Sequence, residues 1–96
     1  MKVEYAPRAV TDLVGIGDQS RRVFGAPVAA VLETTIRATI ARIRAFPEIG
    51  QKLQAHPKVR VIPLGRYPFK IFHTIGSDTV TILHIRHAAR RPWTDP

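Results

Sequence analysis

The sequence predicts an α+β fold in which two helices pack on one face of an antiparallel sheet. The first half of the chain carries hydrophobic residues at helical spacing, and the last third holds three strand-like segments joined by short turns. Connections that short favour antiparallel neighbours. With 96 residues the chain is long enough for one core and too short for two. We therefore expect a single domain over residues 1–96 with the order β-α-α-β-β-β.

A short strand and a first helix should open the chain. The alternating stretch Val3 to Tyr5 is typical of an edge strand. Pro7 suits the first turn of a helix, because the N–H that proline lacks has no partner there. Three residues at spacings i, i+3 and i+4 predict the buried face of this helix and leave Asp12 in water: Val10, Leu13 and Val14.

The second helix should be longer and more regular. Pro27 is placed to begin it. Pro47 should end it near Phe46, because proline lacks a donor and disfavours helical geometry in the residue before it. Between these prolines, hydrophobic residues recur at helical spacing: Val28, Val31, Leu32, Ile36, Ile40 and Ile43. The pattern predicts an amphipathic helix whose apolar stripe faces the core.

Three strands should follow, separated by turns at Gly65–Arg66 and at residues 76–78. If the second turn has an even number of residues, the side chains of the last two strands divide into two sets on opposite faces. The set that is more apolar in its middle should lie under the helices: Phe69, Ile71, His73, Ile75, Val80, Ile82, His84 and Arg86. The other set should form the open face: Lys70, Phe72, Thr74, Thr81, Leu83, Ile85 and His87. Lys70 and His87 would then share the open face, whereas a turn of odd length would separate them.

The charge of the chain points to an anionic partner. Its 15 Lys and Arg residues against 7 Asp and Glu residues give a net charge of +8, which attracts nucleic acid and acidic proteins over long range. A basic, well-solvated surface without a cognate anion is the alternative. The sequence contains no cysteine, which excludes disulfides and thiolate metal sites. No apolar stretch approaches the ~20 residues of a membrane span, so we expect a cytoplasmic protein.

The histidines of the last strand do not predict a metal site, and nothing in the sequence predicts another cofactor. In His84-x-x-His87 the two rings should point to opposite faces of a strand, and no cysteine or carboxylate cluster completes a ligand set. We expect His73 and His84 to be half-buried and hydrogen-bonded instead.

Several pieces of the sequence, taken in their order and spacing, resemble one known family. These pieces are Val3-Glu4-Tyr5, Ala9 with Asp12-Leu13, Ile40-x-x-Ile43-x-x-Phe46-Pro47-x-Ile49-Gly50, Val59-Arg60, Tyr67-Pro68-Phe69-Lys70-Ile71-Phe72, and the arginine-rich exit of the last strand. With them the chain resembles the RelE/ParE superfamily of type II toxin–antitoxin toxins, also called plasmid stabilisation proteins. The resemblance covers nearly the whole chain. It implies a small cytoplasmic bacterial toxin with the topology described above, neutralised by an antitoxin encoded beside it.

The resemblance implies one of two targets. RelE-like members cleave mRNA on the ribosome, whereas ParE-like members poison DNA gyrase. The length of the second helix and the segment Pro47-Glu48-Ile49-Gly50 are closer to the ParE branch. Growth inhibition through gyrase is therefore the leading hypothesis, and mRNA cleavage as an mRNA interferase is the alternative. A third hypothesis, suggested by charge alone, is a non-toxic nucleic-acid-binding module.

The candidate site residues lie in the last third of the chain. For a ribonuclease, the resemblance implies catalytic positions at Lys70, His87 and Arg90, with His87 as acid or base because imidazole changes its charge near neutral pH. The lysine pair that many ribosome-dependent members carry in the second strand is absent. A side chain that merely ends a strand in water is the alternative for His87. The candidate target-binding residues, some of them in a basic tail over residues 88–96, are Arg60, Arg66, Tyr67, Arg86, Arg91 and Trp93.

Overall fold

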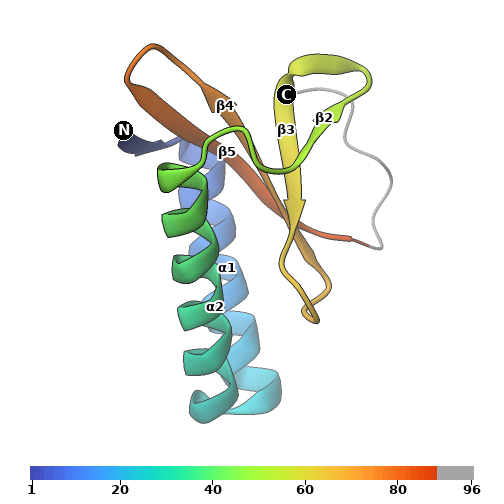
Figure 1. Cartoon of the computed structure of the whole chain (residues 1–96). Coiled ribbons are helices and arrows are strands. Elements are labelled where there is room, and N and C mark those ends of the chain that lie inside the picture. Colours follow the sequence, from blue (N-terminus) through green and yellow to red (C-terminus); the bar gives the residue numbers. More distant parts are fainter. Residues whose placement is uncertain (89–96) are drawn as a thin grey trace.

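The computed structural model describes residues 1–88 and places two helices on one face of a five-stranded sheet (Figure 1). The elements are β1 (Lys2–Tyr5), α1 (Pro7–Phe24), α2 (Ala26–Ala45), β2 (Gln51–Leu53), β3 (His56–Pro63), β4 (Phe69–Ile75) and β5 (Thr79–His87). In the sheet the strands lie in the order β1-β5-β4-β3-β2. The predicted α+β class is confirmed, and β2 is a short strand that the sequence analysis did not predict.

The sheet is mixed rather than antiparallel throughout. The pairs β2–β3, β3–β4 and β4–β5 are antiparallel, as expected for strands joined by short turns. β1 is instead parallel to β5. A parallel neighbour requires a long crossover connection, and the chain between β1 and β5 contains both helices and three strands.

The two helices differ in how well their buried faces were predicted. In α2, the predicted residues Leu32, Ile36, Ile40 and Ile43 are buried. Val28 and Val31, at the start of α2, are exposed, because the helices extend away from the sheet toward the loop that joins them (Figure 1). In α1 the prediction is right for Leu13, but the buried face is rotated by about one residue from the predicted one. Its contacts with the core come from Ala9, Leu13 and Ile16, whereas Val10 and Val14 are exposed.

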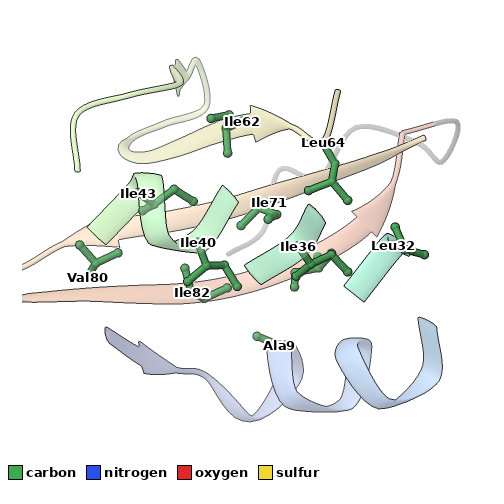
Figure 2. Close-up of a cluster of buried hydrophobic side chains, with 11 residues drawn as sticks. Ala9, Leu32, Ile36, Ile40, Ile43, Ile62, Leu64, Ile71, Val80 and Ile82 are labelled. Atoms are coloured by element: carbon green, nitrogen blue, oxygen red, sulfur yellow. The ribbon is translucent and has the colours of Figure 1, made fainter. Parts of the chain in front are cut away.

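The main core lies between the helices and the sheet face that they cover. Figure 2 shows its aliphatic side chains pointing toward one another from α2 and from the strands, with Ala9 on α1. Ile43, Ile71, Val80 and Ile82 have no measurable exposure. Burial of each such side chain stabilises the fold by roughly 1.5–3 kcal/mol relative to exposure, so this layer holds β4 and β5 firmly under the helices. A smaller apolar cluster, centred on Val59 and Phe72, lies on the opposite face.

A β-bulge in β5 changes the predicted assignment of faces. Near the turn the pairing is as expected, with Val80 opposite Ile75 and Ile82 opposite His73. The next pair is Phe72 with His84, so Leu83 is an extra residue in β5. Because side chains alternate between faces, one extra residue moves every later side chain of β5 to the other face.

The prediction is therefore right up to Ile82 and wrong for the last residues of β5. Ile85 lies opposite Ile71 in the core and is buried, while Arg86 lies opposite Lys70 on the face away from the helices. His87 lies opposite Phe69 on the face that packs against the core. The bulge has a clear physical reason, since an unbulged register would place the Arg86 charge toward the core and Ile85 in water.

Candidate target-binding surface

Two cations lie opposite each other at the open end of the β4–β5 hairpin, far from its turn and on the face away from the helices. Lys70 is exposed and lies directly opposite Arg86, which is half-buried. Two cations that lie side by side can bind one anion together, so the Lys70–Arg86 pair suits a phosphate or a carboxylate of a partner.

His87 lies on the other side of the same strand end, at the rim of a groove. Its ring meets the Phe69 ring edge to face, with centroids 5.5 Å apart. The groove has a volume of about 920 Å³ and runs between α1, the start of α2 and the ends of β4 and β5. We call it the end groove; its apolar lining includes Val23, Phe24 and Val28, and its basic lining includes Arg22, Arg86 and His87. Exposed apolar and basic side chains in one groove suit an acidic amphipathic segment.

Asp12, predicted to stay in water, is instead bonded to β5. Its Oδ2 atom accepts a hydrogen bond from the backbone N–H of Ile85 at 2.9 Å and contacts Nδ1 of His84 at 2.5 Å. The His84 side chain is 5% exposed and that of Asp12 is 19% exposed. Burial lowers the pKa of His84, and the nearby Arg8 and Arg86 act in the same direction, while the Asp12 carboxylate opposes the shift. His84 is thus hydrogen-bonded, as predicted, but by register it shares the face of Phe72.

Arg60, a predicted target-binding residue, is used within the fold. Its Nη1 atom donates to the backbone carbonyls of Glu48 at 2.8 Å and of Gly50 at 3.1 Å. His73, which lies opposite Arg60, bonds through Nε2 to the carbonyl of Pro47 at 2.8 Å. Burial lowers the pKa of His73, Arg60 adds to this shift, and the Pro47 carbonyl opposes it. Two side chains of the sheet therefore hold the segment that follows α2.

The other predicted residues divide between accessible positions and the core. Arg66 is exposed, with its guanidinium carbon 5.8 Å from the centroid of the Tyr67 ring. Tyr67 is half-buried and packs against the main core, so its ring is partly committed to the fold. Arg90, Arg91 and Trp93 lie outside the described residues.

The structure brings some of the predicted site residues together and separates others. Lys70 and Arg86 share one face, while Lys70 and His87 project from opposite faces of the sheet. The sequence analysis missed Asp12 as a residue that contacts β5, and it missed Phe24 as part of the end groove. One signal for the rearranged strand was available: Ile82 and Ile85 are both hydrophobic but three residues apart, which a regular strand cannot place on one face.

Over residues 1–88 the structure shows no group of three or more His, Asp or Glu residues placed to hold a metal ion. Within the same residues, neither helix is both long enough and apolar enough to cross a membrane.

Comparison with known proteins identifies the family. Residues 3–92 match the family model described as the ParE toxin of the type II toxin-antitoxin system, parDE. The chain belongs to the ParE toxin family. This ParE-family chain is accordingly the toxin component of a type II toxin–antitoxin system, as the sequence analysis expected. No curated protein matches its sequence.

Solved structures share the fold of this ParE-family chain. A chain of the chromosomal ParDE TA system from P. aeruginosa superposes with a TM-score of 0.70 at 21% identity, over 91% of this chain and 95% of that one. A chain of the intact E. coli RelBE toxin-antitoxin complex gives 0.66 at 16% identity, over 93% and 98%. The YoeB/ParE toxin from Agrobacterium tumefaciens gives 0.63 at 13% identity, over 91% and 98%. At these identities the likeness shows the fold alone.

Proposed function

We propose that this ParE-family toxin inhibits bacterial growth by poisoning DNA gyrase, and that it does so without cleaving RNA. The observation that carries this proposal is the separation of Lys70 from His87, which project from opposite faces of the sheet. Membership of the ParE family supports the same target.

The separation matters because RNA cleavage needs converging groups. A base for the 2′-hydroxyl, an acid for the leaving oxygen and cations for the phosphate must all lie within hydrogen-bond reach of one phosphodiester. Lys70 and His87 cannot meet at one phosphate from opposite faces. The histidine on the face of Lys70 is His84, which is buried and bonded to Asp12. This arrangement favours a toxin that binds its target over one that hydrolyses RNA.

Ribosome-dependent mRNA cleavage is the second candidate, and one observation favours it. The Lys70–Arg86 pair presents two cations side by side, which suits the phosphate backbone of RNA. In that case the proton transfers would fall to groups other than His87.

We further propose that a cognate antitoxin binds in the end groove. The groove joins exposed apolar side chains with Arg22 and Arg86 on a chain of net charge +8, so an acidic amphipathic segment would be complementary to it in both respects. The ParDE and RelBE neighbours, which come from toxin–antitoxin systems, support such a partner.

The test of the target is induced expression in a bacterial host, with growth, mRNA integrity and a DNA-damage reporter followed together. Gyrase poisoning predicts growth arrest, a DNA-damage response and intact mRNA. Purified toxin should then inhibit supercoiling by gyrase. Growth arrest with mRNA cut within codons would refute the gyrase proposal and support the second candidate. Normal growth would refute both.

Matched charge variants test the surface. Arg86→Ala should weaken growth arrest, because Arg86 belongs to the cation pair proposed to contact the target. Lys58→Ala is the control, since Lys58 is exposed in β3, does not line the end groove and carries the same charge. Equal effects of the two variants would mean that only net charge matters and would contradict the proposed surface.

Two phenylalanines give a matched test of the antitoxin groove. Phe24 is 66% exposed and lines the end groove, whereas Phe46 is 68% exposed and does not. Phe24→Asp should therefore weaken binding of the protein encoded by the adjacent gene by about tenfold or more, the scale of a buried aromatic anchor. Phe46→Asp should leave binding unchanged. The opposite order of effects would place the antitoxin elsewhere.

A further inference from the structure

The outer edge of β5 changes its neighbour at the bulge. β1 runs beside β5 as far as Tyr5, which lies opposite Ile82, and the N–H of Ala6 donates to the Ile82 carbonyl at 2.9 Å. Beyond Ile82, no described strand lies on this edge. Within residues 1–88, the last part of β5, which carries Arg86 and His87, thus has β4 as its strand neighbour.

A single carboxylate of α1 occupies this edge just after the bulge. Asp12 Oδ2 accepts the Ile85 N–H at 2.9 Å, as the carbonyl of a neighbouring strand would do. The same oxygen contacts His84 Nδ1 at 2.5 Å, and the His84 ring stacks on Phe72 of β4 with centroids 6.0 Å apart. Asp12 thus joins α1 to the two residues that follow the bulge, and through His84 to the adjacent strand.

The Asp12 contact lies just after the bulge, where it can hold the residues that follow in β5. The bulge sets the faces of the residues after it, placing Arg86 opposite Lys70 and His87 opposite Phe69. The end of a strand frays more readily than the interior of the sheet. The Asp12 contact holds the side of this strand end away from β4, one residue before Arg86.

We infer that Asp12 is a positioning residue of the toxin: it holds the bulged end of β5 so that Arg86 lies beside Lys70 on the target-binding surface, with His87 on the opposite face against Phe69. Asp12 does not touch the target in this scheme and acts only through β5. The inference rests on the proposed role of Arg86 in target binding, and whether Asp12 holds the end of β5 can be measured without any toxicity.

Amide hydrogen exchange in the full-length protein tests whether Asp12 holds the end of β5. Asp12→Ala should speed exchange of the Ile85 amide by about tenfold or more, because a hydrogen bond to a charged group is lost. Asp18→Ala is the matched control, since Asp18 is also an acid of α1 but pairs with Arg21 at the surface. It should leave the Ile85 amide unchanged. The amide of Val61 in β3 reports whether the whole fold has loosened.

Asp12→Asn provides the conservative variant. The asparagine side-chain oxygen can still accept the Ile85 N–H, so the Ile85 amide should exchange more slowly in this variant than in Asp12→Ala. If Asp12→Ala fails to fold, the comparison between Asp12→Asn and wild type takes its place. A proton–proton contact between the Phe69 and His87 rings should be seen by NMR in wild type and should weaken in the order Asn, then Ala. Unchanged exchange and ring contact in the Asp12 variants would overturn the inference.

Growth arrest tests whether this role of Asp12 matters for toxicity. It also separates the Asp12 inference from the proposed function of the protein. The expected result is that wild type and Asp18→Ala arrest growth, Asp12→Ala does so weakly, and Asp12→Asn lies between them. Faster exchange with undiminished growth arrest would overturn the inference, because Asp12 would then serve the fold alone. A wild-type protein that does not arrest growth would refute the proposed function, while the exchange data would still decide whether Asp12 holds β5.

Discussion

Replacing Gly50 by alanine should destabilise the protein for two separable reasons. Gly50 has a φ of +88°, a conformation in which a side chain costs about 1–2 kcal/mol. A Cβ at this position would lie 2.6 Å from the backbone oxygen of Val61, so β3 or the segment after α2 would have to move. Backbone shifts of this kind cost about 1–3 kcal/mol. Together the two effects give about 2–5 kcal/mol, a large share of the roughly 5–15 kcal/mol that stabilises a small domain.

Urea unfolding measures the effect, and Gly65→Ala isolates its two parts. Gly65 has a φ of +64°, but a Cβ there would meet no heavy atom within 4 Å. Gly65→Ala should therefore show the cost of backbone strain alone, about 1–2 kcal/mol. The difference between the two variants is the cost of the close approach to Val61. Equal destabilisation by both would refute the reasoning, because it would mean that the backbone of β3 yields without cost.

Three further predictions follow from burial and backbone geometry, each read from urea unfolding. Gly15→Ala should raise the free energy of unfolding by about 1 kcal/mol, since Gly15 lies inside α1 with open space around it. A decrease would contradict this helical environment. Ile71→Ala should cost about 2–5 kcal/mol, because Ile71 is fully buried, whereas Val14→Ala, 59% exposed, should change stability by at most about 0.5 kcal/mol. Similar effects of the two variants would contradict the described core. Since burial lowers the pKa of His73 and His84 in the fold, the unfolded chain takes up protons first as the pH falls below about 6.5. Stability should be constant above that pH and fall below it, by up to about 1.4 kcal/mol per pH unit for each histidine, and His73→Gln should flatten the fall. A free energy of unfolding that rises as the pH falls would mean that folding raises the pKa of these histidines, contrary to the prediction.

The regular parts of the fold were predictable because their side-chain pattern repeats. The stripe from Leu32 to Ile43 in α2 follows helical spacing over three turns, and its members are buried as predicted. The face of α1 was not predictable in the same way. Its best-buried residue is Ala9, whose small side chain gives a weak hydrophobic signal, while the larger Val10 and Val14 face water. Small residues are favoured where a helix must approach its neighbours closely, so size and burial diverge there.

The candidate site was harder to predict than the fold, because its geometry depends on one extra residue. Face assignment assumes strict alternation along a strand. The bulge at Leu83 breaks that alternation and reverses the faces of Arg86 and His87. The hydrophobic residues Ile82 and Ile85 carried a hint of the bulge in their spacing, but the bond from Asp12 joins residues 73 positions apart in the chain. No local pattern specifies such a contact.

Net charge also overstates how much positive charge is available to an anionic partner. Arg60 and Arg86 are both arginines of the sheet, and the sequence gives no reason to rank them. Arg60 donates to the carbonyls of Glu48 and Gly50 after the end of α2, so its charge stabilises the fold. Arg86 lies opposite the exposed Lys70, so two cations of neighbouring strands lie side by side at this strand end. Two adjacent cations are complementary in charge to an anionic partner. The Lys70–Arg86 pair is therefore the basic surface that we propose for binding, and an Arg60 variant that loses activity should lose stability with it.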